Sequence, residues 1–179
     1  MTDYDLYTNS GFGLAQVPTL YTLSIVQHNC YGSCNVFLSL FNSLKTATSP
    51  PSFVLLQDPS VYRNRLPAFA GFKAFAPEIR NSVVPKVACY VFYGFLQTYP
   101  IVPLLFGSSN WMALDVHTLS GLFDSNHHVL RIYNGYWTNG SLFNIRTVAP
   151  EQMFPELDFL CLIAGDFNID NLQIGRAHV

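Results

Sequence analysis

The segment FVLLQDP, residues 53–59, decides how the rest of this chain is interpreted. Phe53 to Gln57 form a short, continuous and largely apolar run, which is the pattern of a strand buried on both faces of a sheet. Asp58 and Pro59 end the run, and both residue types are common in turns. The sequence therefore predicts a short buried strand that is followed at once by a polar turn.

The residues before this strand add a second strand and a helix. Residues 20–27, LYTLSIVQ, are β-prone and lead into the polar pair His28-Asn29. From Asn35 to Leu44 the period changes, because the apolar side chains recur at the spacing of one helix face. Asn35 or Ser33 is placed to cap that helix. A strand, a helix and a strand joined by short loops predict an α/β fold rather than an all-β array.

Further strands are expected downstream. Residues 59–85 show no period and carry several basic side chains, so we expect an irregular loop there. Gly121 and the polar cluster at 124–126 are typical of a turn, and they predict a hairpin between two of the later strands. A weak helical pattern covers residues 149–157. The expected strands lie at residues 87–92, 111–118, 129–133 and 159–164.

The composition fits one domain with an apolar core. The chain has 179 residues, of which 50% are hydrophobic and 15% aromatic, whereas only 11% are charged. Charged residues make up about a quarter of a typical soluble domain. Such a composition excludes disorder along the whole chain, because so many apolar side chains will be buried. A formal net charge of −2 also excludes a strongly basic protein that coats nucleic acid.

Neither a membrane span nor a zinc site is expected. Two long segments, 6–44 and 87–114, lack charged residues, but polar residues and prolines interrupt them. A spanning helix needs about 20 predominantly apolar residues in a row. The N-terminus lacks the basic segment of a signal peptide. Of the four cysteines only Cys30 and Cys34 lie close in sequence, so we expect reduced thiols of an intracellular protein rather than a zinc site.

Three polar signals follow apolar strands and could share one site. They are His28-Asn29, Gln57-Asp58 and Asp166-Phe167-Asn168. The functional groups of α/β sheets gather at the carboxyl ends of strands, where residues distant in sequence meet. Two acids and two amides suit a hard cation such as Mg²⁺, which prefers oxygen ligands and keeps several waters. Each signal alone is also an ordinary turn sequence, so only the ordered combination is specific.

Four segments in this order resemble the endonuclease/exonuclease/phosphatase superfamily, the group of AP-endonuclease-like and deoxyribonuclease-I-like proteins. The segments are IVQHN at 25–29, VLLQDP at 54–59, IYN at 132–134 and AGDFN at 164–168. Residues 85–91 and 114–116 are similar to its middle strands, so the resemblance covers about residues 21–170. The chain most resembles the endonuclease domain of LINE-type retrotransposons, fungal ones included. The resemblance implies an α/β fold: a two-sheet sandwich with outer helices in four α/β/β/α layers, incomplete in this chain.

The resemblance also implies roles for individual residues. Asp166 would position or deprotonate the nucleophilic water, and Asn168 would help to stabilise the charge that develops on the phosphate. Tyr133 would contact the phosphate or the catalytic acid. Asn29 would help to hold the metal, Mg²⁺ or Mn²⁺, or the catalytic acid. Asp58 would bind the metal, and it stands where the family usually has a glutamate. Because aspartate is one methylene shorter, the metal would have to sit closer or bind through water.

The last part of the family pattern has no counterpart here. The superfamily ends in a Ser/Thr-Asp-His block, and no histidine matches it, since His117, His127-His128 and His178 all stand elsewhere. The family also has a phosphate-contacting asparagine after the tyrosine, which could be Asn134 or Asn139. The pattern therefore predicts an incomplete site, and the activity of such an N-terminal fragment is in question.

The function that the resemblance implies is DNA nicking by a retrotransposon endonuclease that uses a divalent metal. DNA would be its partner, a reverse transcriptase would belong to the same full-length polyprotein, the location would be nuclear, and no membrane would be involved. We expect residues 1–20 to be a leader, residues 21–171 the partial domain, and residues 172–179 a non-native tail of the kind that a sequencing adapter leaves. Two alternatives stay open: a phosphoesterase for a phospholipid, an inositol phosphate or RNA, and an inactive decayed copy.

Overall fold

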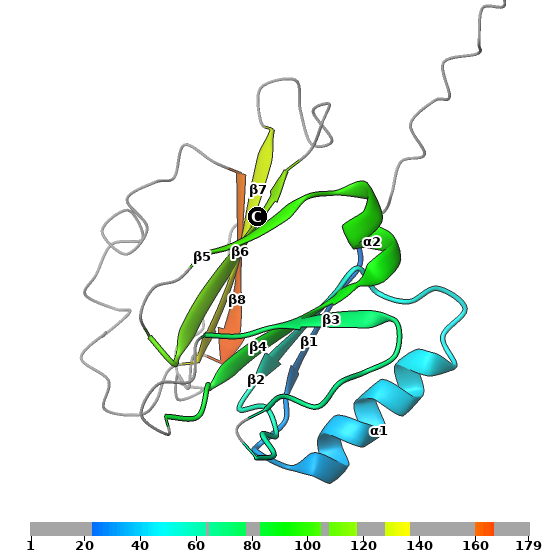
Figure 1. Ribbon diagram of the computed structural model, residues 1–179, viewed down its shortest axis with the longest axis vertical. Coiled ribbons are helices and arrows are strands. Elements are labelled where there is room, and N and C mark those ends of the chain that lie inside the picture. The colour runs from blue at the N-terminus through cyan, green and yellow to red at the C-terminus, as the bar shows by residue number, and fades with distance from the viewer. Residues whose placement is uncertain are drawn as a thin grey trace, which may run out of the picture.

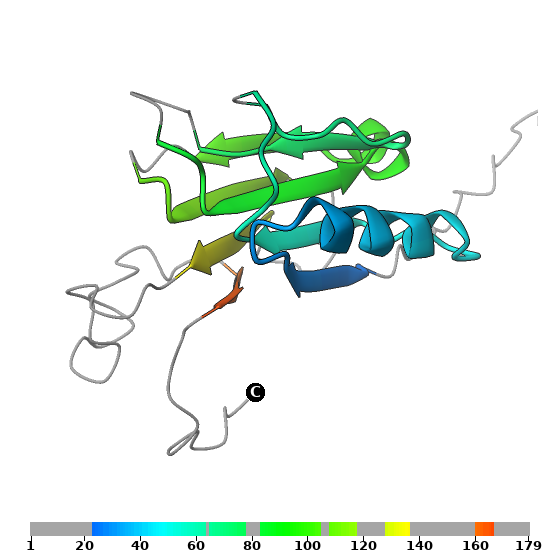
Figure 2. The same cartoon turned by 90° about the horizontal axis from the view of Figure 1, so that it is seen from below.

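Two four-stranded sheets face each other, and one long helix lies on the outer face of the first sheet (Figure 1, Figure 2). The computed structural model describes residues 23–63, 65–77, 83–104, 108–117, 128–136 and 160–166. The two sheets confirm the predicted α/β sandwich. The helices are α1 (Cys34–Lys45) and α2 (Tyr93–Thr98). The strands are β1 (Ile25–Asn29), β2 (Phe53–Gln57), β3 (Phe72–Phe75), β4 (Val87–Phe92), β5 (Ile101–Leu104), β6 (Trp111–His117), β7 (Val129–Tyr136) and β8 (Leu160–Asp166).

The first sheet has the order β1-β2-β4-β3 and is mixed. β1 runs parallel to β2 with Asn29 opposite Gln57, so both strands end at the same edge of the sheet. β4 runs antiparallel to β2, and its first residue, Val87, also lies opposite Gln57. The ends of β1 and β2 and the start of β4 therefore meet at one edge, next to two of the three polar signals.

The second sheet has the order β5-β6-β7-β8. β6 pairs antiparallel with both β5 and β7, which is the pairing that the predicted hairpin requires. β8 runs parallel to β7, so Asp166 at its end lies opposite Tyr136. β8 is an edge strand and contacts β1 and β2 of the first sheet. The third polar signal is thereby brought to the edge where the other two lie.

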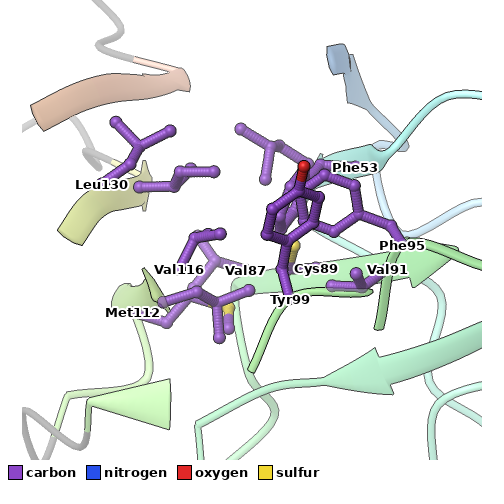
Figure 3. Packing of buried hydrophobic residues seen from close by; sticks show 12 residues of the cluster. Phe53, Val87, Cys89, Val91, Phe95, Tyr99, Met112, Val116 and Leu130 are labelled. Atoms are coloured by element: carbon purple, nitrogen blue, oxygen red, sulfur yellow. The ribbon is translucent and has the colours of Figure 1, made fainter. Parts of the chain in front are cut away.

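Side chains from the facing sides of the two sheets form the main core (Figure 3). In β2, Phe53 and Leu55 point between the sheets, whereas Val54 and Leu56 point to the outer face. Because both faces of β2 are buried, its sequence is continuously apolar rather than alternating. The second sheet contributes Met112, Leu114, Val116, Leu130 and Ile132 to the same core.

Helix α1 covers the outer face of the first sheet. Phe37 and Phe41 are fully buried and pack on Tyr90 of β4, with ring centroids 5.7 and 4.9 Å from it. The Ser33 hydroxyl accepts a hydrogen bond from the Val36 N–H and caps the helix. Ser33 is one of the two residues that the sequence predicts as the N-cap. Burial of a phenylalanine side chain stabilises a fold by roughly 1.5–3 kcal/mol. The helix thus fixes β2 and β4, the strands that lead to the polar edge.

The sequence does not predict three of the elements. β3 lies within the region expected to be irregular, α2 has only six residues, and β5 contains Pro103, which an edge strand tolerates. β7 and β8 also run beyond their predicted ends. The predicted helix at 149–157, the turn at 121–126, and the leader and tail lie outside the described residues.

The described residues bear on two further predictions. They contain no helix over the outer face of the second sheet, which a full four-layer arrangement calls for. No helix in this part of the chain has the length and apolar character to cross a membrane.

Candidate active site

A pocket of about 380 Å³ opens at the edge where β1, β2 and β8 end. Each of the three polar signals contributes at least one residue to the pocket wall, although the signals lie far apart in the sequence. The residues that line it are Gln27, His28, Asn29, Tyr31, Gln57, Gly165 and Asp166. The fold therefore gathers at one pocket residues that the sequence pattern places at three separate strand ends.

The Asn29 side chain joins the two sheets at this pocket. Its Nδ2 donates to Asp166 Oδ2 over 2.6 Å, and its Oδ1 accepts from the Tyr31 N–H over 2.9 Å. The second contact fixes the orientation of the amide, because the oxygen must face the N–H and the NH₂ group then faces the carboxylate. A hydrogen bond to an ionised acceptor is about twice as strong as one between neutral groups. Asn29 thus holds the Asp166 carboxylate at the pocket.

Close packing of β8 allows this contact. Gln27 Nε2 donates to the backbone oxygen of Gly165 over 2.8 Å and ties β1 to β8. A Cβ atom at Gly165 would collide with the backbone oxygen of Gly135 on β7. The glycine before Asp166 therefore serves a close approach between strands, and a side chain there would push Asp166 out of place.

A buried pair of amides lies behind the pocket. Gln57 Nε2 donates to Asn134 Oδ1 over 2.6 Å, and Asn134 Nδ2 donates to the backbone oxygens of Leu56 and Ala88 over 3.0 and 2.9 Å. These bonds tie β7 to β2 and β4. Asn134 is 1% exposed, so its side chain offers no atom to a phosphate in solvent. Gln57 is fully buried, and its Oε1 has no hydrogen-bond partner although the residue lines the pocket.

Asp58 lies at the same edge but is not among the residues that line the pocket, and its carboxylate faces a lysine. Its Oδ1 accepts from Lys86 Nζ over 2.6 Å, and the two side chains are 23% and 38% exposed. The Asp58 N–H donates to Lys86 O, and Asp58 O accepts from the Gly32 N–H, both over 2.7 Å. The φ angle of Asp58 is 44°, in the left-handed region that aspartate tolerates better than most residues. The backbone therefore fixes the direction in which this carboxylate points.

Tyr133 lies on the face of β7 that is turned away from the first sheet. Asn134 contacts the first sheet and Tyr136 packs against the main core, and adjacent residues of a strand point to opposite faces. Tyr133 is buried on the outer face and is not among the residues that line the pocket. Tyr136, three positions later, is the tyrosine that lies opposite Asp166 in the strand register.

The oxygen atoms at this edge are of the type that Mg²⁺ and Mn²⁺ prefer. Asn29, Asp58 and Asp166 carry amide or carboxylate oxygens, and Gln57 Oε1 adds a buried acceptor without a partner. The described residues contain no group of three His, Cys, Asp or Glu side chains that could enclose a metal ion. The oxygen atoms present are compatible with a divalent cation. Asn139 and Asn168 lie outside the described residues.

Two of the four cysteines are buried. All four are free thiols, and the buried ones are Cys30 and Cys89. Burial, with a smaller effect of Asp58, raises the pKa of Cys30 to about 11, and burial raises the pKa of Cys89 as well. Both thiols are therefore protonated at neutral pH.

Sequence reasoning missed several residues of this edge. Gln27 binds β8, Lys86 pairs with Asp58, and Lys86 Nζ lies 5.8 Å from the ring centre of Tyr136. Lys86 can be found only once the pairing of β2 with β4 is known. Because β4 runs antiparallel to β2, the residue before β4 must lie beside the residue after β2.

Comparisons with known proteins identify the fold. No protein-family model matches the chain, and no curated protein does. Among solved structures, the endonuclease domain of TRAS1, a telomere-specific non-LTR retrotransposon, is similar, with a TM-score of 0.57 and 16% sequence identity. The match covers 84% of this chain and 61% of that domain, so the chain spans about three fifths of the domain's length. The chain therefore has the fold of a non-LTR retrotransposon endonuclease domain, as the sequence resemblance implies.

Proposed function

We propose that this chain is a nuclease of the retrotransposon type, which hydrolyses DNA phosphodiester bonds with the help of Mg²⁺ or Mn²⁺. The observation that carries the proposal is the 2.6 Å hydrogen bond from Asn29 to Asp166. It joins the first and the last of the four segments that resemble the family, 137 residues apart, at a pocket of about 380 Å³. The fold shared with the TRAS1 endonuclease domain supports the same function.

Asp166 is the residue that we assign to the attacking water. Its carboxylate lines the pocket and is held by Asn29, so it is placed to orient a water molecule or to accept its proton. Asn168 is proposed to donate a hydrogen bond to the phosphate. A divalent cation bound by Asp58 and Asn29 would neutralise phosphate charge and acidify a bound water.

Two residues of the family pattern receive no direct role in the reaction. Asn134 is buried in the amide pair behind the pocket, and Tyr133 lies on the outer face of the second sheet. Neither lines the pocket. We assign Asn134 to the stability of the sandwich and Tyr133 to packing of the strand that carries it.

DNA is the proposed partner. Tyr31 lines the pocket and is 76% exposed, and its backbone is fixed by a left-handed φ of 52° and by the hydrogen bond to Asn29. Exposed aromatic rings bind nucleic acid by stacking on its bases. We further propose, from the LINE-type resemblance, that a reverse transcriptase belongs to the same full-length polyprotein and that the enzyme acts in the nucleus.

A second candidate is a phosphoesterase that acts on a phospholipid, an inositol phosphate or RNA. The observation that favours it is the formal net charge of −2, because DNA-binding proteins usually neutralise several phosphates with Lys and Arg. Turnover of plasmid DNA, RNA and phosphoinositides by the same preparation separates the two candidates. An inactive decayed copy would turn over none of them.

A nicking assay on supercoiled plasmid with Mg²⁺ or Mn²⁺ tests the proposal. We expect the native chain to nick the plasmid only slowly, because the Ser/Thr-Asp-His block of the family pattern has no counterpart in it, and we expect Asp166→Asn to slow this reaction further by about 10²- to 10⁴-fold. Asn29→Ala should also slow it, whereas Asn42→Ala, at an exposed position of α1, is the matched control and should not. Absence of nicking, or nicking that Asp166→Asn leaves unchanged, would refute the proposal.

A further inference from the structure

Lys86 and Asp58 form an ion pair at the position proposed for the metal. Lys86 Nζ lies 2.6 Å from Asp58 Oδ1, at the short end of the range for a charge-assisted hydrogen bond. Both charges are partly withdrawn from solvent, because the lysine side chain is 38% exposed and the aspartate side chain 23%. An ammonium group therefore already neutralises one of the two carboxylates that the proposed function needs.

Backbone hydrogen bonds hold Lys86 and Asp58 next to each other, so the ion pair does not depend on the side chains alone. The end of β2 lies opposite the start of β4, and the Asp58 N–H donates to Lys86 O over 2.7 Å. The Lys86 N–H in turn donates to Ser109 O over 2.7 Å. The two residues thus leave the same edge of the sheet side by side.

Each partner of the pair is also held from a second side. The backbone oxygen of Asp58 accepts from the Gly32 N–H, and Asp58 Oδ2 is 3.6 Å from the position that a Cβ on Gly32 would take. The Lys86 ammonium lies 5.8 Å from the ring centre of Tyr136, within cation–π range. The aspartate side chain is short, so its carboxylate cannot move far from the Lys86 ammonium group.

We propose that Lys86 is a tethered cation that competes with the divalent metal for Asp58 and so lowers the metal affinity of this site. The inference rests on the proposed use of a divalent cation at this edge. A metal can take Asp58 Oδ1 only after the ammonium has moved off it, and the displaced positive charge stays close enough to repel the metal.

The size of the effect follows from the exposure of the pair. Ion pairs that remain accessible to solvent contribute little. Because the ammonium must leave before the metal binds, loss of the lysine charge should raise the affinity for Mn²⁺ by about two- to fivefold. Retention of a positive side chain should leave the affinity near that of the native chain.

Titration of the full 179-residue chain with MnCl₂ in a calorimeter tests the inference without any measurement of activity. Lys86→Gln and Lys86→Met remove the charge, and Lys86→Arg keeps it. We expect both neutral variants to bind Mn²⁺ about two- to fivefold more tightly than the native chain, and the arginine variant to bind as the native chain does. Adding Asp58→Asn should abolish the gain, because the contested carboxylate is then gone. Thermal melting followed by circular dichroism checks that each variant is folded.

The outcomes separate this inference from the proposed function. If Lys86→Gln melts like the native chain and binds Mn²⁺ no more tightly, Lys86 does not compete, and the inference is overturned. The proposed metal site survives that result when Asp58→Asn still weakens Mn²⁺ binding. A gain that persists in the Asp58→Asn background also overturns the inference. Absence of any Mn²⁺ binding that depends on Asp58 or Asn29 removes the proposed metal use and the inference together.

Discussion

Replacement of Asn134 by alanine should destabilise the sandwich, because its side chain holds the two sheets together behind the pocket. The side chain makes three hydrogen bonds, one with Gln57 and two with the backbone oxygens of Leu56 and Ala88. Alanine leaves all three partners inside the protein without that contact. A typical hydrogen bond contributes about 0.5–1.5 kcal/mol net, and a buried group left unpaired costs more. The three bonds together predict a loss of about 2–4 kcal/mol in the free energy of unfolding.

Urea and thermal unfolding measure this loss. For a domain of this size each kcal/mol lowers the Tm by about 2–4 °C, so Asn134→Ala should melt roughly 5–15 °C below the native chain. Asn42→Ala, at an exposed position of α1, is the control and should change stability by less than about 0.5 kcal/mol. A native-like melting temperature combined with lost nicking would refute the reasoning. That result would mean that Asn134, one of the two candidates for the family's phosphate-contacting asparagine, serves the substrate and not the sandwich.

Gly165→Ala should lower the Tm and slow nicking together, because the new methyl group collides with Gly135; a variant that melts and nicks like the native chain would contradict the packing described for β8. Tyr31→Ala should weaken binding of a single-stranded oligonucleotide roughly tenfold in fluorescence anisotropy, whereas Tyr31→Phe keeps the ring; equal affinities would exclude stacking. The pKa of Cys30 is raised from about 9 to about 11, so burial of the neutral thiol stabilises the fold below pH 9 and this stabilisation is lost as the pH rises through 11. The free energy of unfolding, measured with urea at a series of pH values, should fall between pH 9 and pH 11, and it should fall less steeply in Cys30→Ala. An equally steep fall in Cys30→Ala would contradict the raised pKa of Cys30.

The sequence predicts β2, β4 and α1 well because each buries a regular set of apolar side chains. Phe53–Gln57 and Val87–Phe92 are continuous apolar runs, since the core covers one face of each strand and α1 covers the other. β3 and β5 are edge strands with few buried side chains, and Pro103 further weakens the pattern of β5. The pattern of apolar residues in the sequence reflects how deeply a strand is buried. It therefore predicts the central strands of a sheet and misses the edge strands.

The site is only partly readable from the sequence for a related reason. Asn29 and Asp166 could be assigned to one edge because each follows an apolar strand. Which of Tyr133 and Tyr136 points toward the first sheet depends on the face that β7 turns to it, and a shift of one residue in the strand register would reverse this. The pairing of Lys86 with Asp58 depends on the antiparallel register of β2 and β4, which is a long-range property of the fold.

A double-mutant cycle on plasmid nicking tests most directly whether Asn29 and Asp166 act as one catalytic unit. The nicking rates of the native chain, Asn29→Ala, Asp166→Asn and the double variant are compared at saturating Mg²⁺. Because the two side chains are hydrogen-bonded over 2.6 Å, the losses should be strongly non-additive, and the double variant should nick at about the rate of Asp166→Asn alone. Additive losses, or a native rate for Asn29→Ala, would show that the contact between the two sheets does not serve the reaction.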